Sequence, residues 1–232
     1  MTVCIAAICS RLQYIIEVSD RLVSSDETSA DAVLKMETLV ADVPWTVMFA
    51  GLPTNYKRLI ARIKANLGDG RAPAEIVQAV EEAYRIELLK IHETEVLIPY
   101  GMSRDDFFAH GKERFTEYKF NAIVEVLEQT HTGVTLLIAG FDERGDGHLY
   151  QVSCWGVVKE QPLEFHAIGK WEQHRVRHAL LDSGICPFDL LSGRHLSTVR
   201  REICSRKYPY SRKEHLFLRV GARRERDFRA FA

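Results

Sequence analysis

Two apolar, strand-forming runs joined by a short polar turn open the chain and constrain what can follow. Residues 3–9 and 14–18 form the two runs, and the second one ends in Ser19-Asp20. Apolar runs of this length on either side of a polar turn predict an antiparallel hairpin. Because a hairpin brings its far end back to its near end, the pattern places Asp20 beside Thr2.

Thr2 follows the initiator Met1 directly, and no signal peptide precedes it. If Met1 is removed, Thr2 carries a hydroxyl nucleophile and a free α-amino group, a general base with a reference pKa of ~7.7–8.0. Taken alone, a Met-Thr start more often exposes only a tolerated small residue. The catalytic interpretation therefore depends on the residues that come next.

A single lysine and an Ala-Gly pair complete the N-terminal pattern. Lys35 opens an amphipathic stretch over residues 35–40, and a further strand over 45–51 ends in Ala50-Gly51. This order resembles the N-terminal half of a proteasome-type β subunit and its bacterial HslV relative, members of the N-terminal nucleophile hydrolases. The resemblance implies a site of terminal threonine, strand-end aspartate, lysine and glycine.

The matching positions in this chain are Thr2, Asp20, Lys35 and Gly51, and Arg21 falls where the family often has an arginine. The lysine charge would lower the pKa of the terminal amine and stabilise the deprotonating hydroxyl. Asp20 would pair with Lys35, and the backbone N–H of Gly51 would approach the oxyanion of the tetrahedral intermediate.

Each of these residues also has a simpler explanation. Asp20-Arg21 after a strand is typical of a turn, Lys35 of a solvated lysine, and Ala50-Gly51 of a strand end. Their occurrence together, in this order, favours the site.

The second half of the chain extends the resemblance. An apolar strand over 135–142, a turn at 145–147 and a strand over 148–152 are similar to the central hairpin of the family. Residues 165–169 then lead into a helix over 171–182, as they do in that family. The resemblance covers most of residues 2–60 and 134–220 and rests on ordered motifs.

The chain departs from the family at two supporting positions. Proteasome β subunits usually carry serines after the Ile-Gly that here is followed by Lys170, and later an Arg-Asp-x-x-Ser-Gly segment. In this chain Lys207 occupies the expected aspartate position, and only Ser211 can stand in for the serine. Missing supporting hydrogen bonds can leave a site present but poorly oriented.

Composition agrees with a globular chain. The 232 residues are 46% hydrophobic and 27% charged, which is enough to bury a sizeable core in one domain, residues 1–232. A net charge of −1 argues against nucleic acid as a general partner. Arginines crowd the last fourteen residues, and this pattern favours a frayed, solvated terminus over a docking tail. They are Arg219, Arg223, Arg224, Arg226 and Arg229.

Cysteine and histidine usage does not indicate a metal or disulfide framework. Five cysteines without a Cys-x-x-Cys pair predict reduced, mostly buried thiols. His174 and His178 could share a helix face, but two arginines lie between them and no glutamate does, so a zinc site is disfavoured. No apolar run approaches the ~20 residues that span a bilayer.

Helices dominate the middle of the chain. Periodicity predicts them over 55–67, from Pro73 to about Val96, and over 103–128 in two pieces with Ser103 as N-cap. The segment 90–130 is longer than the family's helix pair requires, and we expect it to modify the entrance or the ring contacts. The simpler alternative is a longer solvated helix.

Two further helices are predicted over 170–183 and 196–206, before a last strand over 216–220. This order predicts an α+β fold, a four-layer αββα sandwich with an extended helical segment at about 54–128.

The resemblance implies a cytoplasmic threonine-type peptidase that acts on peptides or unfolded proteins and assembles into a homo-oligomeric ring. An ATPase partner is possible in such a system, and no metal or organic cofactor, nucleic acid or membrane is implied. Two alternatives stay open. One is a scaffold subunit with weak or lost catalysis, and the other is an N-terminal nucleophile amidase that acts on a small amide.

Overall fold

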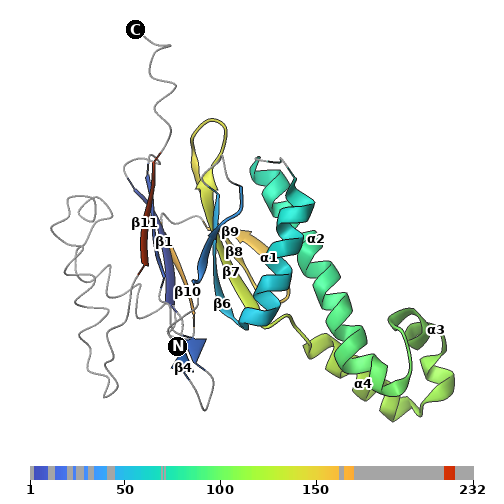
Figure 1. Cartoon of the computed structure of the whole chain (residues 1–232). Coiled ribbons are helices and arrows are strands. Elements are labelled where there is room, and N and C mark those ends of the chain that lie inside the picture. The colour runs from blue at the N-terminus through green and yellow to red at the C-terminus, as the bar shows by residue number, and fades with distance from the viewer. Residues whose placement is uncertain are drawn as a thin grey trace, which may run out of the picture.

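The fold contains two antiparallel sheets and a helical arm, seen in a computed structural model of the chain (Figure 1). The structure describes residues 3–9, 14–19, 23–24, 29–30, 34–40, 45–68, 70, 72–161, 165–169 and 217–222. The helices predicted over 170–183 and 196–206 lie outside these residues.

The first sheet is built on the predicted N-terminal hairpin. Its strand order is β10-β1-β2-β11, and every pair is antiparallel. The hairpin pairs Cys4 with Ser19 and Cys9 with Tyr14, which confirms the predicted return of the chain. The strands are β1 (Val3–Cys9), β2 (Tyr14–Ser19), β10 (Phe165–Gly169) and β11 (Phe217–Ala222).

The second sheet has the order β5-β6-β7-β8-β9 and is also antiparallel. Its central hairpin, β7 and β8, confirms the apolar strand, turn and second strand predicted over 135–152. The strands are β5 (Met36–Thr38), β6 (Thr46–Gly51), β7 (Val134–Phe141), β8 (Gly147–Val152) and β9 (Val158–Glu160). A separate two-stranded ribbon consists of β3 (Val23–Ser24) and β4 (Ser29–Ala30).

Three layers are visible among the described residues: the first sheet, the second sheet and a helix pair (Figure 1). The helix pair consists of α1 (Pro53–Leu67) and α2 (Pro73–Ile91). The four-layer sandwich expected from the sequence requires one more helical layer, which would have to come from residues outside this description.

Alternation along the strands explains how the layers pack. On β6, Met48 and Ala50 belong to the core between the two sheets, whereas Val47 and Phe49 belong to the core beneath the helices. Residues two apart share a face of a strand, so apolar residues at every position give a sheet that is covered on both sides. The inter-sheet core also contains Cys4, Ala6, Ile8, Ile15, Leu137, Ala139 and Ile168.

An ion pair between one buried carboxylate and two partly exposed arginines links the two long helices. Glu87 of α2 is fully buried, and its Oε1 lies 2.7 Å from Nε of Arg58 on α1, with Arg62 3.8 Å from Oε2. Because a buried carboxylate without a partner is costly, this pairing favours one alignment of α1 and α2.

The helical arm continues α2 away from the sheets (Figure 1). A π-helical turn, His92–Leu97, and a short 3₁₀ turn, Ile98–Tyr100, lead into α3 (Arg104–Arg114) and α4 (Glu117–Gln129). The predicted N-cap is confirmed, since Ser103 Oγ accepts a hydrogen bond from the backbone N–H of Asp106 at 3.2 Å. The predicted division of 103–128 into two helical pieces is confirmed, and the pieces separate at Phe115 and Thr116.

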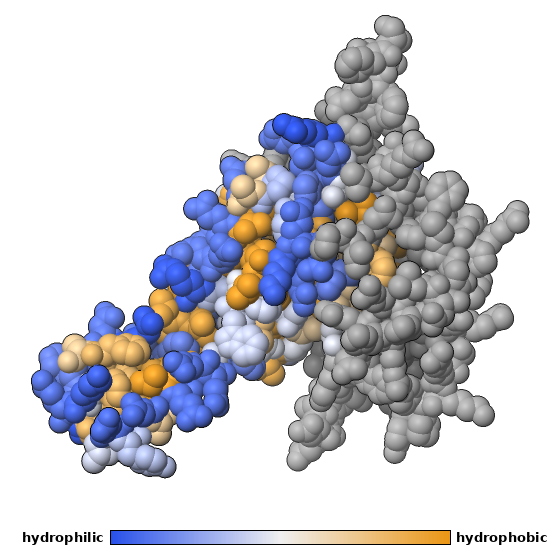
Figure 2. Space-filling view, turned by 180° about the vertical axis from the view of Figure 1, so that it is seen from behind, coloured by the Kyte–Doolittle hydropathy of each residue, from blue (hydrophilic) through white to orange (hydrophobic). Residues whose placement is uncertain are grey.

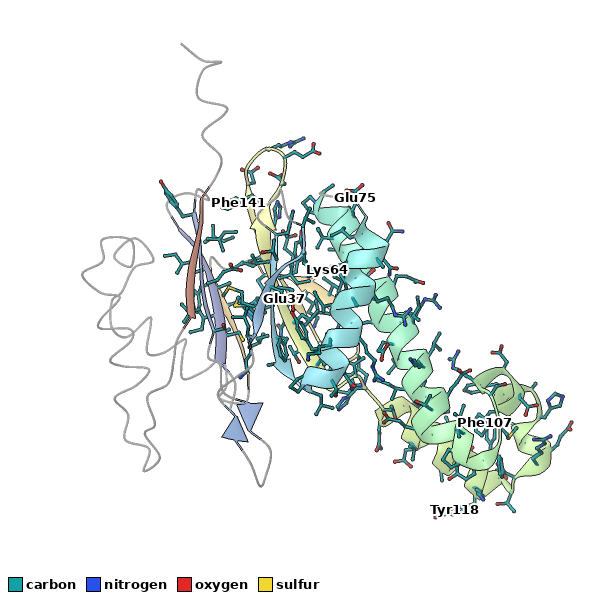
Figure 3. All side chains as sticks on the ribbon, viewed as in Figure 1. Glu37, Lys64, Glu75, Phe107, Tyr118 and Phe141 are labelled. Atoms are coloured by element: carbon teal, nitrogen blue, oxygen red, sulfur yellow. The ribbon has the colours of Figure 1, made fainter. Side chains whose placement is uncertain are left out.

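The arm has a core of its own, distinct from those of the sheets. Figure 3 shows Phe107 pointing into this core, while Tyr118 lies at the outer end of the arm. Phe107 stacks on Phe120 with ring centroids 4.9 Å apart. The remaining buried members are Val96, Leu97, Met102, Ile123 and Leu127. The segment 90–130 thus packs as a small helical lobe and not as one long solvated helix.

Candidate active site

Three strand ends of the first sheet meet where the chain begins. β1 runs between β2 and β10, and the register pairs Val3 with Gly169 and Cys4 with Ser19. The N-terminal end of β1 therefore adjoins the C-terminal ends of β2 and β10. Figure 1 places the start of β1, the end of β6 and the start of α1 at the same end of the molecule.

Lys35 lies beside β6 and is 1% exposed. Its carbonyl oxygen accepts a hydrogen bond from the N–H of Phe49 at 3.2 Å, two residues before Gly51. The explanation of Lys35 as a solvated lysine is therefore wrong. An ammonium group at this depth is costly unless other groups compensate its charge.

A thiol connects this part of β6 to β1. Cys4 Sγ donates to the carbonyl oxygen of Phe49 at 3.4 Å, across the space between the two sheets. The same residue, Phe49, thus contacts Lys35 through its N–H and Cys4 through its carbonyl. Through Phe49, these two contacts bring the backbone of Lys35 close to Cys4 of β1. Cys4 stands two positions after Thr2 in the sequence.

Gly51 ends β6 with a positive φ of 120°. A Cβ atom at this position would lie 1.9 Å from the carbonyl oxygen of Gly133, so the two backbones are too close for any side chain. The next residue reinforces the contact, since Leu52 N–H donates to Gly133 O at 3.1 Å. Close packing alone therefore requires glycine here, and the oxyanion role remains a prediction.

Two buried hydroxyls near these residues were not singled out by the sequence. Ser19 Oγ and Tyr56 Oη are both buried without a hydrogen-bond partner among the residues described. Ser19 pairs with Cys4 in the register. The sequence could have pointed to Ser19, because it ends a strand directly before Asp20. Tyr56 stands in the first turn of α1, and nothing in the sequence around it indicates a site.

Burial favours the neutral form of two ionisable side chains in this part of the molecule, Tyr56 and His166. Burial, then Glu37 and Cys4, raise the pKa of Tyr56 well above its usual value, and its ring stacks on Phe49 with centroids 3.8 Å apart. Burial also lowers the pKa of His166, a residue of β10 that pairs with Ala6 of β1.

A second buried charge crosses the core between the sheets. Glu17 of β2 is 2% exposed, and its carboxylate accepts a hydrogen bond from the hydroxyl of Thr46 on β6. Thr46 Oγ1 also lies 3.2 Å from the carbonyl oxygen of Ala139 on β7. This contact joins the first sheet to the second and holds β2 in register.

The other predicted site residues cannot be placed. Thr2, Asp20 and Ser211 lie outside the described residues, as do Arg21, Lys170 and Lys207. Of the five predicted catalytic positions, the structure describes Lys35 and Gly51.

Neither a metal cluster nor a membrane span is found in the part of the chain that the structure describes. Within it, no three His, Cys, Asp or Glu side chains are arranged to hold a metal ion. None of the described helices is long and apolar enough to cross a membrane. His174 and His178 are outside the described residues.

Comparison with known proteins gives one kind of match. No family model matches the chain, and no curated protein matches it in sequence. Among solved structures, the chain is similar to eukaryotic HslV from Trypanosoma brucei, with a TM-score of 0.56. The match covers 95% of this chain and 99% of that one at 14% identity. The chain therefore has two sheets and helices arranged in an HslV-like fold.

The Gly51 contact predicts a large loss of stability in Gly51→Ala. Steric overlap with Gly133 adds to the backbone strain at positive φ, so we expect a loss of about 2 kcal/mol or more, or roughly 5 °C in Tm. Thermal unfolding followed by circular dichroism measures it. Gly101→Ala is the matched control, because Gly101 also has a positive φ of 66° but no atom within 4 Å of its Cβ position. Equal losses in the two variants would contradict the packing argument.

Proposed function

We propose that the chain is a threonine-type peptidase of the N-terminal nucleophile type. The observation that carries this proposal is the burial of Lys35 to 1% exposure beside β6, in a chain with an HslV-like fold. An apolar residue would fill a buried position without the cost of a charge. A charged lysine there is best explained by a task in the site.

The proposed reaction is acyl transfer. Thr2 Oγ attacks the peptide carbonyl, and the neutral α-amino group of the same residue accepts its proton. Lys35 lowers the pKa of that amine and stabilises the developing alkoxide. The protonated α-amino group of Thr2 then gives its proton to the nitrogen of the scissile peptide bond. The bond breaks, the amine product departs, and the acyl group stays on Thr2 as an ester. Water, activated by the same amine, hydrolyses the ester.

The supporting residues have proposed roles as well. Asp20 compensates the buried charge of Lys35 and orients it, and the Gly51 N–H donates to the oxyanion. Ser211 takes the place of the family's supporting serine. Continuing the β1–β2 register by two positions would put Thr2 on the same face as the Cys4–Ser19 pair.

A complete sandwich belongs to this proposal. Ala7 and Ile16 are buried on the face of the first sheet that does not meet the second sheet. An apolar, buried outer face favours a further layer on that side, and we assign it to the helices predicted over 170–183 and 196–206. Residues 1–232 then form one domain with four layers and a helical arm.

A catalytically weak scaffold subunit is the second candidate. Lys170 and Lys207 favour it, because they stand where the family has hydrogen-bonding serine and aspartate residues. A small-amide hydrolase is a third possibility with the same nucleophile. The proposed setting is the cytoplasm, with an ATPase as a possible partner and no cofactor.

Thr2 must be the mature N-terminus, since an amide-linked Thr2 has no free amine to act as base. Methionine removal before a small residue requires no propeptide. N-terminal sequencing or intact-mass measurement of the native protein should show the loss of Met1. Retention of Met1 in the native protein would exclude the catalytic proposal.

Thr2→Ala and Lys35→Met should each lower peptide hydrolysis by at least ~10³-fold, because both act in one chemical unit. The double variant should be no worse than either single one, and Thr2→Ser should keep partial activity. Lys35→Met places an apolar chain of similar volume in the buried site, so the fold should survive. Labelling of Thr2 by an epoxyketone or β-lactone gives a second readout, which intact-mass spectrometry detects.

Lys64→Ala is the control for the lysine change. Lys64 is a partly exposed lysine that pairs with Glu37 at 2.9 Å, and such pairs contribute about 1 kcal/mol or less. Figure 3 shows this pair at the edge of α1, where it faces β5. Activity should stay near the wild-type level. Wild-type activity in Thr2→Ala would place the nucleophile elsewhere.

We expect a closed homo-oligomer of at least six subunits, with contacts from the helices at 54–95 and 103–128. The arm leaves large apolar side chains exposed, including Ile98 at 61% and Tyr118 at 86%, and symmetric assembly covers such groups. Light scattering on the purified chain measures the mass. A monodisperse 26.5 kDa monomer at micromolar concentration would contradict the ring and the chambered peptidase.

A further inference from the structure

The outward face of α4 carries an apolar stripe that nothing in the described chain covers. Tyr118, Ala122 and Val126 are four residues apart and therefore lie on one side of the helix. Tyr118 is 86% exposed and Val126 is 49% exposed. The opposite side of the same helix is buried in the arm core through Phe120, Ile123 and Leu127.

Acidic residues flank this stripe. Glu117, Glu125 and Glu128 are all exposed on α4, and Lys119 is the single basic residue of the helix. The Lys119 ammonium lies 5.1 Å from the ring centroids of both Tyr100 and Phe115, so it is directed back onto the arm. The outward face is consequently acidic and apolar together. Figure 2 shows apolar patches between hydrophilic ones over the arm.

The rest of the chain offers a segment of complementary composition. Residues 170–232 hold 15 of the 31 Lys and Arg residues but only 7 of the 32 Asp and Glu residues. The last ten residues, 223–232, combine four arginines with Phe228 and Phe231. Arginine and aromatic residues are those enriched in the centre of protein interfaces. Such a segment matches a face with exposed glutamates around an apolar stripe, and this match favours the docking tail that the sequence pattern alone disfavoured.

We propose that the outward face of α4 in one copy of the chain binds residues 223–232 of a second copy. Arginines of the segment pair with Glu117, Glu125 and Glu128, while its phenylalanines cover Tyr118 and Val126. The contact is heterologous, joining different surfaces of the two copies, and such contacts generate rings when their rotation closes. It concerns assembly and does not depend on catalysis.

The topology favours a second copy over the same copy. Residues 223–232 follow β11, an edge strand of the first sheet, whereas α4 extends from the helix pair on the far side of the second sheet (Figure 1). Ala222 at the end of β11 pairs with Tyr14, so β11 ends away from the start of β1, whereas α4 lies toward the end of the molecule where β1 starts (Figure 1). A segment that starts on the outer sheet is therefore better placed to meet a neighbouring molecule.

A labelled peptide with the sequence of residues 221–232 tests the contact on the full chain. Fluorescence anisotropy should show saturable binding that weakens strongly between 50 and 500 mM NaCl, as expected for ion pairs. The double change Glu117→Lys, Glu125→Lys should weaken binding by at least ~10-fold, because attraction becomes repulsion. Tyr118→Ser should weaken it as well. The Thr2→Ala variant should bind like the wild type.

Two controls separate this surface from general charge effects. Glu143→Lys reverses an exposed acid on the turn between β7 and β8 and should leave binding unchanged. A peptide with its four arginines replaced by serine should not bind. Equal binding to the wild type and the doubly reversed variant, or no binding at 100 µM peptide, would overturn the proposal.

Photo-crosslinking distinguishes a second copy from the same copy. A benzoylphenylalanine in place of Tyr118 in unlabelled chain is mixed with ¹⁵N-labelled wild-type chain and irradiated. The expected product joins position 118 of an unlabelled chain to a peptide from residues 223–232 of a ¹⁵N-labelled chain. Cross-links confined to light–light pairs after full subunit exchange, or directed at another segment, would refute the contact between copies.

Discussion

The apolar layer between the two antiparallel sheets is the constraint on which the other features depend. Cys4 and Ala6 of β1 pack in one cluster with Met48 of β6 and Ala139 of β7. A shift of one residue in any of these strands would exchange the side chains of its two faces and disrupt the packing on both sides. The layer therefore fixes which residues reach the end of the molecule where β1 begins, β6 ends and the candidate site lies.

Polar groups refine this packing where apolar contacts cannot. The contact between Glu17 and Thr46 can form in only one alignment of the two sheets, because both side chains are almost wholly buried. Cys4 adds a second link to the carbonyl of Phe49. Cys4 is on β1 and Glu17 is on β2, so the hairpin that follows Thr2 in the sequence is held to the second sheet at two positions.

Sequence patterns predicted most of the strands and helices that the structure describes, because each depends on neighbours in the chain. The hairpin over 3–18, the strand over 45–51 and the Ser103 N-cap are examples. Contacts between distant segments gave no local signal. The approach of Gly51 to Gly133 and the burial of Lys35 both arise from how β5, β6 and β7 come together. The separate core of the arm was likewise invisible, since helical periodicity does not say what a helix packs against.

Lys35 illustrates why a buried charge informs about function when a buried apolar residue does not. Removing an ammonium from water costs several kcal/mol, and a well-packed apolar side chain could fill the same space with equal or better stability. Gly51 is different, because close packing against Gly133 requires glycine whether or not its N–H faces an oxyanion. The two residues thus carry unequal weight. Lys35 conflicts with stability and needs a chemical explanation, whereas Gly51 is fully explained by packing, and the case for a nucleophile site depends on the lysine.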